Sequence, residues 1–241
     1  MIEFFKRYKV LSLIALVVVV GGIWLATKDG GTDGSKTSSS INKDVQSKCM
    51  NDVNDELFCK FAGSFANVGD YKITANISSE SGSSVLEVAN DAKGNSSMVV
   101  KQNGQEQGNI IAYNGVTYSK DYSDGQWFKY SASDATKPES VDLKKELVKG
   151  DFKADNGQKI DYKNLGTEKC GSLNCYKYQV NDPTKLDTEG FIWFDTKDYL
   201  LRRITAKDAS TNTDMTLSYS AVNISAPSPT KDVPSASSSD Q

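Results

Sequence analysis

The pattern of apolar and polar residues divides the chain into four parts. Residues 10–26 form a run without a charged side chain. Apolar residues then recur at helical spacing between 42 and 65. From 71 to about 220 they alternate with polar residues, as in strands that bury one face. The last residues, 223–241, are rich in Pro and Ser and show no such pattern, so we expect 227–241 to be a disordered tail.

The uncharged run predicts a single-pass membrane helix, residues 10–27. At about 1.5 Å per residue it is roughly 25 Å long, slightly shorter than the hydrocarbon core of a bilayer. Basic residues dominate the preceding segment 1–9, so we expect that segment to be cytoplasmic and the rest of the chain to lie outside. An uncleaved anchor in the cell membrane is the preferred interpretation. A cleaved signal with a secreted product is the alternative.

A Gly, Ser and Thr linker, residues 28–44, leads from the anchor to one domain, 45–226. The first structured part of this domain is an amphipathic helical segment whose apolar stripe should pack on the rest. The stripe consists of Val53, Leu57, Phe58, Phe61 and Phe65.

The alternation after residue 71 predicts about ten or eleven antiparallel strands. The clearest is a hairpin, 109–113 and 116–120, joined by Asn114-Gly115. The other candidate segments are 71–78, 84–89, 97–101, 126–130, 159–163, 166–170, 175–180, 190–194, 200–206 and 215–220, which with the hairpin makes twelve segments for these ten or eleven strands. A helix opened by Pro138 and closed by Gly150 should interrupt them. The fold class is therefore α+β.

The four cysteines lie in a domain expected outside the cytoplasm, so disulfides are favoured over metal. Their spacing favours Cys49–Cys59 and Cys170–Cys175; two free thiols or a crossed pairing are the alternatives. A straight helix would separate Cys49 from Cys59 by about 15 Å. Pairing therefore requires the chain to fold back in between, and the stretch 51–55 offers a turn and an N-cap.

Composition argues against most enzyme classes. The chain has no histidine, which removes Ser–His and Cys–His nucleophile pairs and histidine zinc sites. No phosphate-binding loop or calcium loop is evident, so no cofactor and no metal are expected. A carboxylate-pair enzyme stays open, although no acidic pair has distinctive spacing. The net charge of −3 gives no reason to expect nucleic acid as a partner.

Three local patterns resemble the LolA/LppX-like superfamily of lipoprotein carriers and lipid-binding lipoproteins. The first is 114–118 (NGVTY) leading to 126–128 (QWF). The second is 190–195 (GFIWFD) followed by 200–204 (LLRRI). The third is 216–219 (TLSY). The resemblance extends over about residues 45–226. It implies a curved antiparallel half-barrel in a bacterial cell envelope, with helices covering an apolar cavity.

The resemblance implies a membrane-tethered binding protein for a lipid, a lipoprotein or another hydrophobic ligand. A non-enzymatic sensor or interaction domain that binds a protein partner is the alternative. The oligomeric state is not indicated. The candidate cavity residues are Trp127, Phe128, Leu143, Leu147, Phe152, Phe191 and Trp193. The strand 191–194 is apolar on both faces, so one face needs a cover other than the helices.

Overall fold

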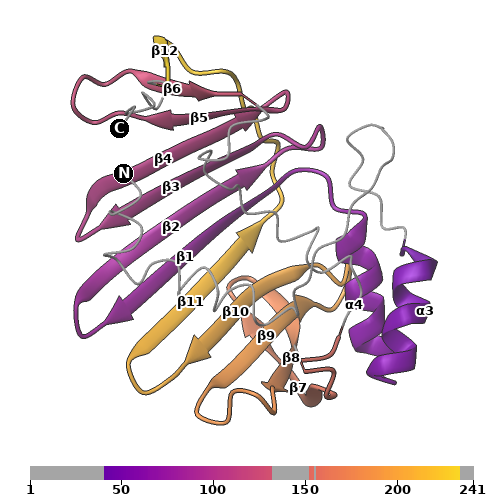
Figure 1. Ribbon diagram of the computed structural model, residues 1–241. Helices are drawn as coiled ribbons and strands as arrows, with labels where there is room; N and C mark the ends of the chain where they lie inside the picture. Colours follow the sequence, from indigo (N-terminus) through magenta and orange to yellow (C-terminus); the bar gives the residue numbers. More distant parts are fainter. Residues whose placement is uncertain (1–40, 132–151, 155, 234–241) are drawn as a thin grey trace, which may run out of the picture.

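The computed structural model describes residues 41–131, 152–154 and 156–233. These residues form two helices and one 12-stranded sheet, which is open and twisted (Figure 1). The expected α+β class is confirmed. The predicted anchor at 10–27 and the predicted helix with Leu143 and Leu147 lie outside the described residues and stay predictions. Among the helices that are described, none is long and apolar enough to cross a membrane.

The strand order is β12-β6-β5-β4-β3-β2-β1-β11-β10-β9-β8-β7. Neighbouring strands are antiparallel, except that β12 runs parallel to β6. The strands are β1 (Tyr71–Ser79), β2 (Gly82–Asn90), β3 (Ser96–Gln102), β4 (Gln105–Tyr113), β5 (Val116–Lys120), β6 (Trp127–Tyr130), β7 (Asp161–Cys170), β8 (Leu173–Asn181), β9 (Glu189–Asp195), β10 (Leu201–Lys207), β11 (Thr211–Ser218) and β12 (Thr230–Asp232).

The hairpin of β4 and β5 forms where the sequence predicts it. Asn114 and Gly115 have φ of 49° and 77°, the left-handed values that a tight hairpin turn requires. The strands expected at 159–163 and 166–170 are instead one strand, β7. A bulge lies between Asn164 and Thr167, at Gly166 with φ of 94°. The bulge interrupts the alternation, which explains why one strand gives two signals.

The first described elements are a pair of helices, α3 (Lys43–Asp52) and α4 (Glu56–Ala66). The Asp55 carboxylate caps α4 by accepting from the Phe58 amide at 3.0 Å. The Cys49–Cys59 disulfide joins the two helices with its Cα atoms 5.4 Å apart, so the predicted pairing and the reversal between the cysteines are confirmed. The chain just before α3 also passes close to α4, because a Cβ on Gly63 would lie 2.6 Å from Cγ2 of Ile41.

The second predicted disulfide is confirmed as well. Cys170 and Cys175 join β7 to β8 across their turn, with the two Cα atoms 5.9 Å apart. The prediction of a disordered tail from residue 227 is wrong for Thr230–Asp232, which forms β12 against β6. A three-residue strand beside prolines has no local signal, because only its pairing partner makes it a strand.

Candidate ligand-binding face

One face of the sheet packs against α4, and we call it the helix face. The ring of Phe61 stacks on Phe194 of β9 at 4.9 Å, and Phe58 contacts Tyr178 of β8 at 5.6 Å. Phe65 contacts Tyr71, the first residue of β1, at 6.0 Å. In agreement, Figure 1 shows α3 and α4 side by side near the end of the sheet that holds β7 to β10. None of these three ring contacts of α4 involves β2, β3 or β4.

Two rows of apolar side chains cross the helix face. Directly paired residues point to the same side of a sheet, so the register traces each row from strand to strand. We call them the apolar rows. The first consists of Tyr178, Ile192, Ile204, Met215, Ala75, Leu86 and Val100. The second consists of Leu217, Ile73, Val88, Met98 and Ile110.

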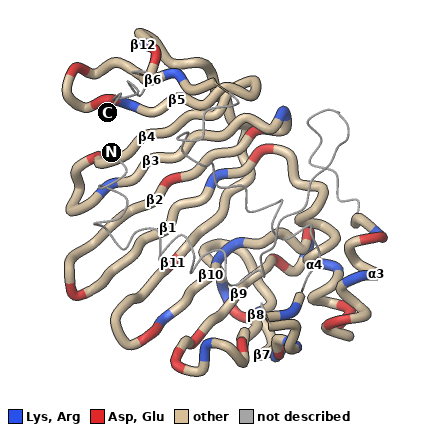
Figure 2. The backbone as a smooth tube through the Cα atoms, in the orientation of Figure 1, with Lys and Arg blue, Asp and Glu red and all other residues tan. Residues whose placement is uncertain are grey.

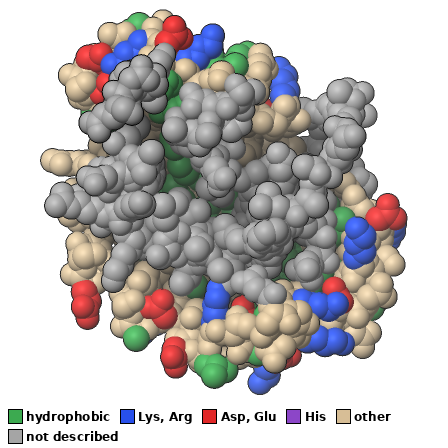
Figure 3. All heavy atoms as spheres, in the orientation of Figure 1, with side chains coloured by type: hydrophobic (Ala, Val, Ile, Leu, Met, Phe, Trp, Pro, Cys, Tyr) green, Lys and Arg blue, Asp and Glu red, His purple; other side chains and the backbone are tan. Residues whose placement is uncertain are grey.

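The apolar rows continue well beyond the strands that carry the ring contacts of α4. Val88 and Met98, at 3% and 5% exposure, belong to the same hydrophobic cluster as Phe65 of α4. Green hydrophobic side chains of the sheet are visible in Figure 3 between the atoms drawn in grey. Burial of an apolar surface of this kind is favourable, at about 25 cal/mol for each Å² removed from water.

Polar groups border the apolar rows on both sides. Asn90 follows Val88 on the helix face of β2, opposite Tyr71. Thr213 precedes Met215 on the helix face of β11, opposite Ile77. Both side chains are buried, and Nδ2 of Asn90 and Oγ1 of Thr213 have no hydrogen-bond partner.

The opposite face holds a cluster of aromatic and charged side chains around Trp193. Trp193 is 4% exposed, and its indole N–H donates to Glu168 of β7. The Arg203 guanidinium lies 5.0 Å and the Lys177 ammonium 5.1 Å from the centre of its ring. Lys177 also lies 4.7 Å from the ring of Phe191. The cations of these cation–π contacts lie over the rings of Phe191 and Trp193, on the strand face for which the sequence analysis required a cover other than the helices.

The sequence-predicted site residues are thus divided between the two faces. Phe128 lies on the helix face, and Phe152 packs edge-to-face on Phe58 at 5.9 Å. Trp127, Phe191 and Trp193 lie on the opposite face, away from α4. The expectation that all of them share one cavity with the helices is therefore corrected for these three. The physical reason is that their strands are apolar on both sides, and alternation alone does not say which side faces α4.

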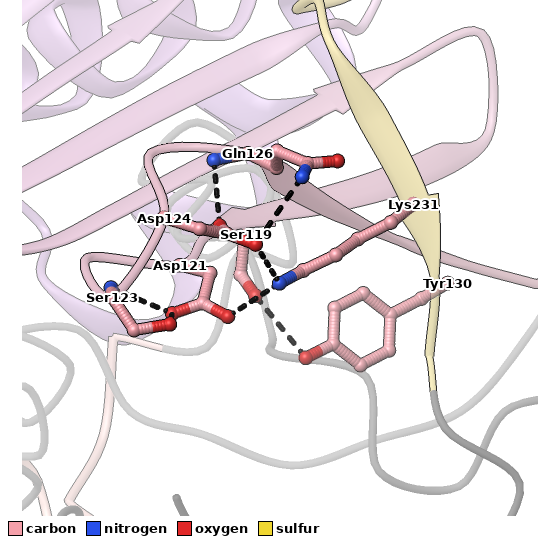
Figure 4. A network of polar contacts seen from close by, with 7 residues as sticks. All are labelled: Ser119, Asp121, Ser123, Asp124, Gln126, Tyr130 and Lys231. Atoms are coloured by element: carbon pink, nitrogen blue, oxygen red, sulfur yellow. Dashed lines mark hydrogen bonds and ion pairs between the residues drawn. The ribbon is translucent and has the colours of Figure 1, made fainter.

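A network at the β6 edge fixes the C-terminal segment (Figure 4). The Lys231 ammonium contacts Asp121 at 2.6 Å and Asp124 at 2.7 Å, and it lies 4.4 Å from the ring of Phe128. The hydrogen bonds from Lys231 and from the Ser123 amide lower the pKa of Asp121 to about 2. We call Lys231, Asp121 and Asp124 the edge clasp.

Within the described residues, no group of three or more Cys, Asp and Glu side chains is placed to hold a metal ion. Sequence reasoning missed Asn90 and Thr213 as candidates, because a single Asn or Thr in an alternating strand carries no signal until the register assigns its face. Asn90 lies two residues after Val88, and Thr213 lies two residues before Met215. This spacing could have indicated that each polar side chain shares a strand face with its apolar neighbour.

No protein-family model and no curated protein matches this chain. Among solved structures, lipoprotein LppX of Mycobacterium tuberculosis matches with 13% identity and a TM-score of 0.46, over 76% of this chain and 100% of LppX. LprF from Mycobacterium bovis matches with 16% identity and a TM-score of 0.47, over 78% and 99%. A LolA superfamily protein from Nitrosomonas europaea matches with 9% identity and a TM-score of 0.27, over 74% and 92%.

Proposed function

We propose that this chain is a binding protein that holds a hydrophobic ligand against the helix face of its sheet. The observation that supports this most directly is the extent of the apolar rows, which continue across β2, β3 and β4 beyond the ring contacts of α4. An apolar surface of this kind binds hydrocarbon without requiring charge or metal. The proposed ligand class is a lipid or the acyl part of a lipid-modified protein.

We also propose that the domain works outside the cytoplasm while tethered to the cell membrane by residues 10–27. The two disulfides support an oxidising compartment. A tether would keep the domain beside a membrane, where acyl chains are concentrated. We propose binding without catalysis, in keeping with a chain that has no histidine.

Mass spectrometry tests the proposed function. The full chain, purified in a detergent of known mass, is weighed under native and denaturing conditions and then extracted with organic solvent. We expect a stoichiometric extra mass of lipid size that is present only in the native spectrum. A clean mass, with no uptake from offered lipids, would contradict the proposal and favour a protein partner.

Two adjacent valines of β3 provide a matched pair of variants. Val100 belongs to an apolar row, whereas Val99 pairs with Glu87 on the opposite face, and both are half-buried. We expect Val100→Trp to reduce the amount of bound lipid, because the indole would occupy the surface on which the ligand lies. Val99→Trp should bind as the wild type does. Equal binding by both variants would place the ligand elsewhere.

A further inference from the structure

We infer that Asn90 and Thr213 contact the ligand and hydrogen-bond the polar groups of a neutral, ester- or amide-linked acyl lipid whose hydrocarbon lies on the apolar rows. This inference rests on the proposed function and goes further, because it names the contacts and the kind of headgroup.

The first observation is that both polar groups are buried without a partner. Asn90 is 6% and Thr213 is 3% exposed, and Asn90 Nδ2 and Thr213 Oγ1 make no hydrogen bond. A buried group that loses water without gaining a partner is costly, and folded proteins contain few of them. A ligand that supplies the missing partners removes this cost.

The second observation is where the two groups lie. Asn90 flanks one apolar row beside Val88, and Thr213 flanks the other beside Met215. Their partners on β1 are Tyr71 and Ile77, which are about 20 Å apart along an extended strand. Each border of the apolar surface thus holds a buried, uncharged side chain with a polar atom that has no hydrogen-bond partner. Such an arrangement suits a ligand with a long hydrocarbon part and isolated polar groups.

The third observation concerns charge. Each of the strands β1 to β4 and β11 contains one charged residue, and all of these residues lie on the opposite face. They are Lys72, Glu87, Lys101, Glu106 and Asp214. In Figure 2 the charged positions of these strands are short isolated segments in long tan stretches. On the helix face of these five strands a charged headgroup would therefore find no counterion, and an unpaired buried charge is strongly unfavourable.

The chemistry of the two groups narrows the ligand further. The Nδ2 atom of Asn90 only donates, so its partner must be an acceptor, and the Thr213 hydroxyl can donate or accept. A carbonyl oxygen of an ester or amide meets both requirements without charge. A plain hydrocarbon would leave both groups unpaired, and a carboxylate or phosphate would bring a charge.

The experiment compares three probes of similar length, methyl palmitate, octadecane and the palmitate anion. The full chain, purified in detergent and freed of lipid, is titrated with each radiolabelled probe, and bound probe is measured after gel filtration. We expect the wild type to bind methyl palmitate about fivefold more tightly than octadecane, the size of one neutral hydrogen bond. Palmitate should bind more weakly than its methyl ester.

The double variant Asn90→Leu/Thr213→Val should bind methyl palmitate no more tightly than octadecane, with octadecane affinity unchanged. The denaturant midpoint of the double variant should not fall below that of the wild type, because Nδ2 of Asn90 and Oγ1 of Thr213 have no hydrogen bond to lose. The matched control is Asn109→Leu/Thr216→Val, which changes the same residue types on the opposite face of β4 and β11. This control should keep the fivefold preference. The single variants, Asn90→Leu and Thr213→Val, show how much of the preference for methyl palmitate over octadecane depends on each side chain.

The outcomes separate the two claims. If the wild type binds octadecane and methyl palmitate equally well, the ligand contacts proposed here are wrong and the proposed function stands. A preference that survives in the double variant and in both single variants would overturn the inference in the same way. If palmitate binds as tightly as its methyl ester, the inference that the ligand has a neutral headgroup is wrong. If none of the probes binds, both the inference and the proposed function fail.

Discussion

The Tyr178 hydroxyl donates to the carboxylate of Asp55, with both oxygens at 3.0 Å, and thereby ties β8 to the N-terminus of α4. The Asn164 amide donates to the same hydroxyl at 3.1 Å, so β7 joins the contact. Burial and the hydrogen bond to Asp55 raise the pKa of Tyr178 above its usual value. One hydroxyl thus positions the helix that defines the helix face.

Replacing Tyr178 with Phe tests this contact. We expect the free energy of unfolding to fall by about 1.5–2 kcal/mol, since the lost bond is to a charged acceptor. Urea unfolding measures the change. Tyr176→Phe removes a hydroxyl from the same strand and the same face without touching the α4 cap, and it should change stability by less than about 0.5 kcal/mol. Equal effects would show that Tyr178 does not hold α4 through Asp55.

Two adjacent arginines should differ in their effect on stability. Arg202 binds Asp195, a carboxylate that is 4% exposed and also accepts from the Asp198 amide. Arg203 binds Asp214 at the surface, where the pair is 42% and 39% exposed. We expect Arg202→Met to cost about 3 kcal/mol, because it leaves a buried carboxylate without its cation.

Arg203→Met is the comparison. We expect it to cost less than about 1 kcal/mol, because an exposed ion pair contributes little and only one of the two cations over Trp193 is lost. Thermal unfolding of both variants in one buffer measures the difference. A larger loss for Arg203→Met would mean that the Trp193 cluster is more important to stability than the buried Asp195 pair.

Trp193 should stabilise the fold without contacting the ligand. It lies on the opposite face between Lys177 and Arg203, so Trp193→Leu should lower the free energy of unfolding by about 2 kcal/mol through lost packing. Lipid binding by the folded variant should equal that of the wild type. Phe128→Leu replaces an aromatic residue of the helix face in the same way, and its lipid binding is measured beside that of Trp193→Leu. Binding lost in folded Trp193→Leu would return Trp193 to the list of ligand contacts.

Acid should release the C-terminal strand. The pKa of Asp121 is lowered from 3.8 to about 2 by Lys231 and Ser123, and the pKa of Asp124 is lowered too. A lowered carboxyl pKa means that the stabilisation is present above about pH 4 and is lost as the pH falls toward 2. The Trp127 amide donates to the Pro229 carbonyl at 3.0 Å, so its hydrogen exchange reports on the strand.

We expect exchange of the Trp127 amide, corrected for the intrinsic rate, to accelerate below about pH 4 in the wild type. In Lys231→Met it should already be fast at neutral pH. Asp232→Asn changes the next residue of β12, outside the edge clasp, and should behave as the wild type. If Lys231→Met retains slow exchange at neutral pH, the edge clasp does not hold β12.

Local sequence signals predicted most of the sheet, and tertiary contacts explain what they missed. β1 and β5 follow from their alternation and from Asn114-Gly115, because a half-buried strand must alternate. β12 depends on its pairing with β6 and has no signal of its own. The face of Phe191 and Trp193 depends on register, which aligns Lys177 with Trp193 and which no single strand reveals.

The two edges of the sheet bear on whether copies of the protein can stack into a continuous sheet. An open edge strand is a template for another chain, and natural sheets block it. At one edge, β12 supplies only three residues beside β6. At the other, β7 is bent by its bulge at Gly166 and carries Lys163 and Lys169. Both ends of the sheet thus oppose the addition of strands from another copy, so a wide and strongly apolar sheet can exist without polymerising through its edges.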